Sequence, residues 1–294
     1  MRLKISYIIL QLISLSVFGQ DNSKAFYRKV HQAEVLYNRG DLDSSILTYE
    51  LAFSEINYVN SSYIYNILSL SKISKDKKRI KLYKQILDDK KSCPNKTLLN
   101  QVDSLFKVDQ LTRSNKFYKA FKFYKECNND TLCDKTSRKY IRSKFLYEYS
   151  ESVDTTNIIF LLKLLDGAGG YRGEAMLGTK YFQRINVLFL HFDKDTNNII
   201  LKPYLDYSLQ NGYLTPVYYA LIIDRHLYNT SGTQKYWTWP LINSNPKLSV
   251  IQLDEIDEFR EDIGIFDSKL SVINFGKQWI VKNEYFTIGA YENR

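Results

Sequence analysis

The chain has 294 residues, of which 44% are hydrophobic and 15% aromatic, and its formal net charge is +9. This composition supports a sizeable buried core and excludes a chain that is disordered throughout. The cationic residues are spread along the whole chain, and the densest run, at 72–84, alternates with apolar residues as the solvated face of a helix does. We therefore expect no nucleic-acid partner.

The first residues have the pattern of a secretory signal peptide. Two cations precede an apolar run at 5–15, which is shorter than the roughly 20 residues of a membrane span. Val17 and Gly19 supply the small residues that a signal peptidase recognises. We therefore predict a signal peptide at 1–19, a mature chain beginning at Gln20, no stable membrane span, and a periplasmic or secreted location.

Two helical hairpins are predicted next, within a unit spanning 20–92. Apolar residues at helical spacing mark 24–39 and 42–56, and a second hairpin of the right length covers 61–89. The residues with small-large alternation in the first hairpin are Ala33, Gly40, Ser45, Tyr49 and Ala52. They resemble a tetratricopeptide repeat, in which small residues let the paired helices approach each other. Fewer than three such repeats would not be stable alone. We expect the hairpins to pack on the rest of the chain and to bind any envelope protein or peptide partner.

A second unit, 93–270, is also predicted to be mainly α-helical. Helical spacing marks the segments 97–106, 117–124, 131–149, 157–165, 174–191 and 254–263. The glycine-rich break at 167–173 lacks the ending of a phosphate-binding loop, so we interpret it as a turn. One short β-hairpin is predicted, with 235–242 paired to 248–253. The tail at 271–294 is irregular.

Six motifs occur in order between residues 97 and 270. They are Asp109-Gln110-x-x-Arg113, Gly170-Tyr171-Arg172 with Gly178, His191 at a helix end, the apolar run closing in Asp224-Arg225, Gln234-Lys235-Tyr236-Trp237-Thr238, and Ile256 to Arg260 with Gly264-Ile265. This series resembles the family catalogued as domain of unknown function 6624. The chain departs from it at Trp237, where the family has glycine, and at Trp239, where it has glutamine. Because the family has no assigned activity, the resemblance implies a fold and candidate residues but no chemistry.

The charged motif residues are expected to form one polar cluster. Asp109 and Arg113 lie four apart on one helix face, and Asp224 and Arg225 follow an apolar run that must be buried. The favoured interpretation is a buried network that specifies helix packing. A catalytic site would use His191 as general base, oriented by Asp109 or Asp224. A ligand site would use Gln110, Arg113, Arg225, Gln234, Tyr236, Trp237 and Trp239.

The two tryptophans of that last group leave two alternatives open. If they are exposed, Trp237 and Trp239 are stacking platforms for a sugar or a peptide side chain. If they are buried, they cover the helices beneath them, and we favour this alternative.

The cysteine and histidine residues do not indicate a metal or cofactor. Cys127 and Cys133 flank a short polar turn and are the best candidates for a disulfide, which leaves Cys93 free; three unpaired thiols are the alternative. No Cys-x-x-Cys occurs, and the histidines lack ligand spacing. The acidic loop at 193–198 lacks the glycine and glutamate of a calcium loop. We predict an exported envelope protein with a binding or scaffolding role; the alternative is a hydrolase acting on an envelope polymer.

Overall fold

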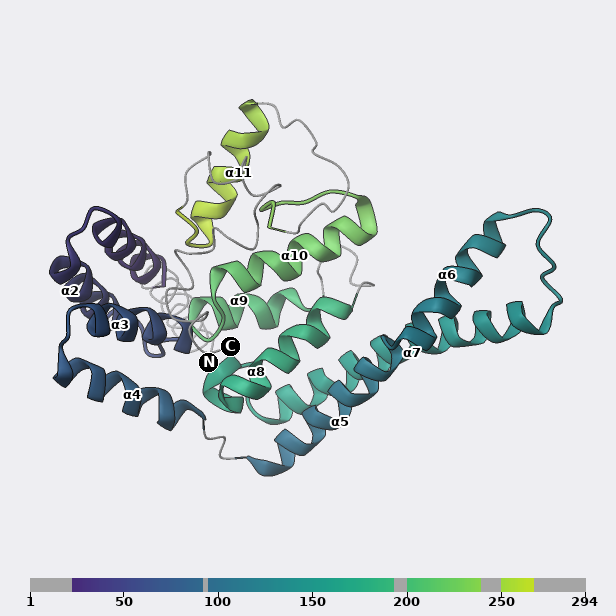
Figure 1. Ribbon diagram of the computed structural model, residues 1–294, viewed down its shortest axis with the longest axis horizontal. Helices are drawn as coiled ribbons and strands as arrows, with labels where there is room; N and C mark the ends of the chain where they lie inside the picture. Colours follow the sequence, from purple (N-terminus) through teal and green to yellow (C-terminus); the bar gives the residue numbers. More distant parts are fainter. Residues whose placement is uncertain (1–22, 92–94, 193–199, 239–249, 267–294) are drawn as a thin grey trace, which may run out of the picture.

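The computed structural model describes residues 23–91, 95–192, 200–238 and 250–266 (Figure 1). All regular secondary structure in these ranges is helical, so the predicted mainly α fold is confirmed. None of the helices described there combines the length and the apolar character that a membrane crossing requires.

The first described residues belong to a group of helices on one side of the molecule (Figure 1). They are a helix at 23–38, α2 (Leu42–Phe53), α3 (Ser61–Ile73) and α4 (Lys77–Lys91) (Figure 1). Ala33 and Ser45 are fully buried, and the Ser45 hydroxyl donates to the Ala33 carbonyl over 2.7 Å. The small side chains therefore bring the first two helices close together, as the sequence predicts.

These N-terminal helices share a core with the rest of the chain. The Tyr27 hydroxyl lies 3.2 Å from the carbonyl oxygens of both Leu209 and Leu214. The backbone N–H of Ser61 donates to a carboxylate oxygen of Glu174 over 3.0 Å. A single hydrophobic cluster includes buried residues from the first helix and from the segment after the last one. The expectation that the hairpins pack on the rest of the chain is confirmed.

The central body consists of α5 (Lys96–Thr112), part of α7 (Arg138–Gly167), α8 (Gly173–His191), α9 (Lys202–Gln210) and α10 (Pro216–Ser231) (Figure 1). Helix α8 packs on α4, α5, α7 and α10 and is kinked at Gly178, whose φ is +71°. A Cβ at Gly178 would lie 3.0 Å from the Lys91 carbonyl oxygen. Glycine thus allows α8 to approach the end of α4.

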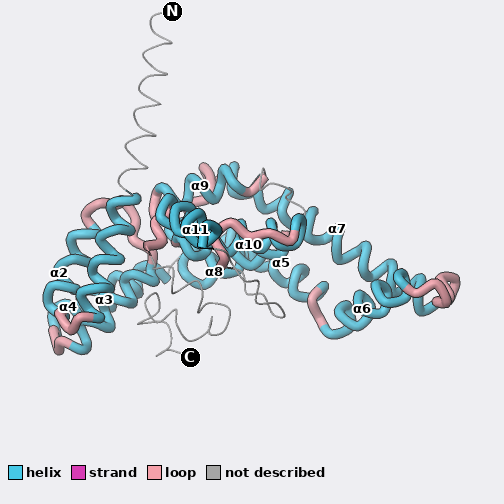
Figure 2. Tube along the Cα trace, turned by 90° about the horizontal axis from the view of Figure 1, so that it is seen from above, coloured by secondary structure: helices cyan, strands magenta, loops and turns pink. Residues whose placement is uncertain are grey.

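A helical hairpin projects from this body. We call it the arm: α6 (Asn115–Asn129), the connection at 130–137, and α7 as far as Tyr149 (Figures 1 and 2). The sequence predicted two helices, at 131–149 and 157–165. That is wrong, since one helix of 30 residues, about 45 Å long, runs through both segments. It begins after Ser137, whose hydroxyl accepts from the Tyr140 N–H over 3.3 Å.

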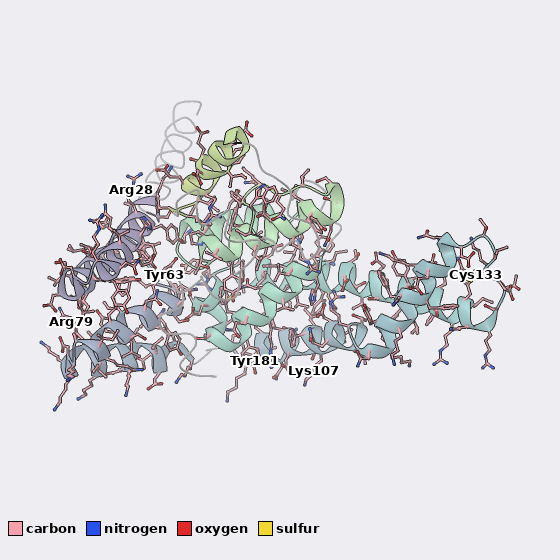
Figure 3. The ribbon with its side chains drawn as sticks, turned by 45° about the horizontal axis from the view of Figure 1, so that its top comes forward. Arg28, Tyr63, Arg79, Lys107, Cys133 and Tyr181 are labelled. Atoms are coloured by element: carbon pink, nitrogen blue, oxygen red, sulfur yellow. A yellow bond between two sulfur atoms is a disulfide. The ribbon has the colours of Figure 1, made fainter. Side chains whose placement is uncertain are left out.

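A disulfide closes the tip of the arm. It joins Cys127 at the end of α6 to Cys133, with the Cα atoms 5.3 Å apart, and these are the two cysteines that the sequence favours as a pair. Figure 3 shows Cys133 at the far end of the arm. Cys93 lies outside the described residues.

We expect the disulfide to hold the tip of the arm closed. Replacing Cys127 and Cys133 by serine should destabilise the arm by about 2 kcal/mol, because a loop of this length then regains its freedom in the open state. Amide hydrogen exchange measured by mass spectrometry should accelerate in α6 and not in α8. Peptide mapping without reductant should find Cys93 free, and a bridge that uses Cys93 would contradict the pairing.

The predicted β-hairpin is wrong for the residues that the structure describes. Helix α11 (Val250–Asp262) begins four residues before the predicted helix at 254–263 and occupies most of the second strand. Residues 235–238 form a turn around a buried carboxylate instead. The remainder of the predicted hairpin, 239–249, lies outside the described residues, as does the tail at 271–294.

Candidate functional site

Asp109 and His191 meet where α5 and α8 end. The carboxylate oxygens of Asp109 lie 2.8 and 2.9 Å from Nδ1 of His191. The Asp109 side chain is 1% exposed, whereas the His191 side chain is 17% exposed. Gln110 donates from Nε2 to the second Asp109 oxygen over 2.8 Å. The buried carboxylate therefore orients a histidine that solvent can reach.

Arg113 and Asp154 complete the group, which we call the His191 cluster. Nη2 of Arg113 lies 3.2 Å from Asp109 Oδ1 and 2.9 Å from Asp154 Oδ1, while Nε lies 2.7 Å from Nδ1 of His191. Arg113 follows the last turn of α5, and Asp154 lies midway along α7. Burial raises the pKa of Asp154, and the Arg113 guanidinium partly opposes this. The cluster thus joins three helices.

Nδ1 of His191 has two competing partners. If this nitrogen carries a proton, it donates to Asp109; if it does not, it accepts from Nε of Arg113. The position of the proton on the ring therefore decides which of the two partners binds Nδ1.

The cluster has the parts of an acid–base site. An imidazole whose Nδ1 is held by a carboxylate presents Nε2 as a proton acceptor. Among the described residues, none forms a hydrogen bond with Nε2 of His191. No group of three or more possible metal ligands occurs in the same part of the chain. The arrangement can thus support proton transfer to or from a bound molecule.

Sequence reasoning missed Asp154. It precedes Asn157, Ile158 and Leu161 by three, four and seven residues, and these three are buried on one face of α7. A carboxylate on the buried face of a helix needs a partner. The spacing of Asp154 from these buried residues could therefore have identified it as a candidate.

Asp224 belongs to a different group, which we call the Asp224 turn. Its side chain is fully buried in α10. Oδ1 accepts from the N–H groups of Lys235 and Tyr236 over 2.7 and 2.8 Å. Oδ2 accepts from the N–H and hydroxyl of Thr238 over 2.6 and 2.7 Å. Burial raises the pKa of Asp224, although these four donors oppose the increase.

Arg260 of α11 binds the same turn from the other side. Nη1 of Arg260 donates to the Tyr236 carbonyl over 3.3 Å, and Arg260 is 1% exposed. The N–H groups of the turn therefore point at the Asp224 carboxylate, while the Tyr236 carbonyl points at the Arg260 guanidinium. This arrangement links α10 to α11 and places the side chain of Tyr236 in the core.

The prediction of one polar cluster is wrong for Asp224, because its hydrogen-bond partners differ from those of Asp109, Arg113 and His191. Asp109, Arg113 and His191 come together, but within the described residues Asp224 forms no hydrogen bond with any of them. The backbone of the turn already satisfies the Asp224 carboxylate. Arg225 and Gln234 are half-buried. The geometry leaves Asp109 as the carboxylate that could orient His191.

Trp237 occupies a backbone conformation that favours glycine. Its φ is +56°, in the left-handed region, which costs an L-residue about 1–2 kcal/mol. The position where the resembled family has glycine is thus one that glycine would occupy without strain. Trp237 is half-buried, so its exposure is intermediate between that of a stacking platform and that of a residue that covers the helices beneath it. Trp239 lies outside the described residues.

Comparison of the chain with protein-family models, with curated proteins and with solved structures finds no match. The resemblances to domain of unknown function 6624 and to tetratricopeptide repeats therefore stay predictions that rest on the sequence motifs.

Proposed function

We propose that this is an exported protein of the cell envelope that binds or scaffolds another envelope protein or peptide through its N-terminal helices. The observation that carries the proposal is a second apolar stripe on α2. Leu47 and Leu51 are 53% and 60% exposed and lie four residues apart on the same helix face.

This stripe is not needed for the core of the protein. Helix α2 already buries Ile46, Tyr49 and Ala52 against its neighbours. Exposed apolar residues also occur on the adjacent helices, with Ile73 in α3 and Leu82 in α4. Two apolar side chains on one exposed helix face, such as Leu47 and Leu51, are more typical of a protein interface than scattered single residues are.

A photo-crosslinking amino acid placed at Leu51 tests this role in the native host. We expect one discrete adduct in the envelope fraction, because the residue would lie in the interface. Leu47→Ser should reduce the yield of adduct several-fold without unfolding the protein, since the side chain is exposed. The matched control is the crosslinker at Lys163, an exposed position on α7, which should give no adduct. Absence of an adduct at Leu51 would contradict the proposal.

A second candidate function is hydrolysis of an envelope polymer. The observation in its favour is that the buried Asp109 holds His191 by Nδ1 in the geometry of a carboxylate-oriented base. In this role Nε2 of His191 would take a proton from a water molecule as its oxygen attacks the polymer. The protonated ring would then give that proton to the leaving group as the scissile bond breaks. Arg113 would help to hold the polymer's developing negative charge. The stability of variants of Asp109 and His191 separates this candidate from a structural role.

A further inference from the structure

The arm carries a large excess of positive charge for its size. Residues 115–149 contain nine lysines and arginines against four acidic residues, which gives a net charge of +5 for this segment. Within the arm only Lys122 and Lys144 form ion pairs, with Glu126 and Glu148 over 3.8 and 3.7 Å. In the part of the chain that the structure describes, the remaining cations of the arm have no carboxylate partner.

Apolar side chains share the outer face of α7 with two of these cations. Ile141 and Phe145 are 58% and 63% exposed, and Tyr149 follows four residues later, also exposed. Arg138 and Arg142 lie on the same face, because each is three or four residues from a member of this apolar row. We call these five residues the α7 outer row. Glu148, already paired with Lys144, lies at its edge.

The inner face of the arm does not need these residues, except for Tyr149, whose ring centroid lies 6.2 Å from that of Phe117 in α6. Tyr124 stacks on Tyr147 with the ring centroids 5.0 Å apart, and Phe121 lies 5.2 Å from Tyr147. Tyr140 and Cys127 are buried between the two helices. The α7 outer row is therefore a second apolar surface on a hairpin that is already closed by its own aromatic contacts and by the disulfide.

We infer that the α7 outer row binds the surface of a bilayer that contains anionic phospholipid. A helix that lies in such a surface has apolar residues flanked by lysine and arginine, as this row does. Its arginines can reach the lipid phosphates while Ile141 and Phe145 enter the boundary of the acyl chains. The arm projects beyond the body, so that it can approach a flat surface (Figures 1 and 2).

Two other occupants fit the row less well. A second copy of the chain would bring a second arm of net charge +5 against the first, and like charges oppose that contact. A protein groove that buried Ile141 and Phe145 would also have to bury the neighbouring guanidinium groups of Arg138 and Arg142. Burial of charges is costly unless each one is paired. A bilayer surface avoids this cost because its phosphates lie at the depth of the arginines.

Flotation of the purified mature protein with unilamellar vesicles tests the inference. We expect binding to vesicles of equal parts phosphatidylcholine and phosphatidylglycerol, and little binding to phosphatidylcholine alone. Arg138→Gln with Arg142→Gln should weaken binding about 30-fold, at about fivefold for each cation near the surface. Phe145→Ser should weaken it about tenfold through lost apolar contact.

The matched control removes the same charge elsewhere. The variant Lys77→Gln/Lys81→Gln removes two exposed cations of α4 that are four residues apart, as Arg138 and Arg142 are. Its binding should stay within about twofold of that of the unmodified protein. Circular dichroism of each variant checks that the fold is kept. An equal loss in the control pair, or equal binding to both kinds of vesicle, would overturn the inference. The adduct expected at Leu51 does not depend on this result.

Discussion

Asp224→Ala should lower the free energy of unfolding by about 3–5 kcal/mol. The substitution leaves three backbone N–H groups and one hydroxyl of residues 235–238 without their acceptor in a buried place. Each unsatisfied buried donor costs about 1–3 kcal/mol, and removal of a buried charge offsets part of the total. Chemical denaturation followed by circular dichroism measures the loss.

Two further variants define the cause. Asp224→Asn keeps one acceptor oxygen but turns an amide NH₂ group toward the N–H donors of the turn, so that it should also destabilise, by less than alanine does. Glu258→Ala removes an exposed carboxylate from α11 and should change stability by no more than about 0.5 kcal/mol. An Asp224→Ala protein that unfolds at or above the temperature of the unmodified protein would refute the structural role of this residue.

Asp109→Ala is also expected to destabilise the fold if the His191 cluster is structural. The variant leaves His191 and Gln110 without a shared acceptor and Arg113 with Asp154 as its one carboxylate partner among the described residues; because the Arg113 side chain is 30% exposed, the loss should be about 1–3 kcal/mol. His191→Ala should cost less, because its side chain is partly exposed. Thermal unfolding of each variant provides the measurement.

The double variant Asp109→Ala/Arg113→Ala distinguishes the two roles of the cluster. In a structural network, the double variant should lose less unfolding free energy than the two single variants together. The reason is that Arg113→Ala removes the cation that Asp109→Ala has left without one of its carboxylate partners. A catalytic site would behave differently, since removal of an active-site side chain is often neutral or stabilising. Stability equal to or above that of the unmodified protein in Asp109→Ala and His191→Ala would therefore favour the hydrolase.

Local features of the sequence were sufficient to predict several contacts. Asp109 and Arg113 are four residues apart, and their side chains meet because this spacing places them on one helix face. Gly40 ends the first helix with φ +84°, and the Asp41 side chain accepts from the Ser44 N–H at the start of the next one. Each of these interactions joins residues within about one helical turn, so that it depends little on the rest of the chain.

Contacts between residues far apart in the chain could not be predicted from the sequence in the same way. The sequence showed that Asp224 follows a buried run and therefore needs donors, but not which ones. A backbone turn satisfies a carboxylate as well as a guanidinium does, and the choice depends on which segment passes over α10. For the same reason the helical pattern on both sides of residues 150–156 did not show that α7 continues through them.

The amino-acid sequence by itself determined the helical class, the close approach of the first two helices through Ala33 and Ser45, and the pairing of Asp109 with Arg113. Periodicity and short spacings encode these features. Only the tertiary structure decided that Asp154 joins the His191 cluster, that Asp224 holds a turn, and that one face of α7 remains exposed on a projecting arm. These features arise where segments far apart in the chain meet, or fail to meet, and no local spacing specifies that outcome.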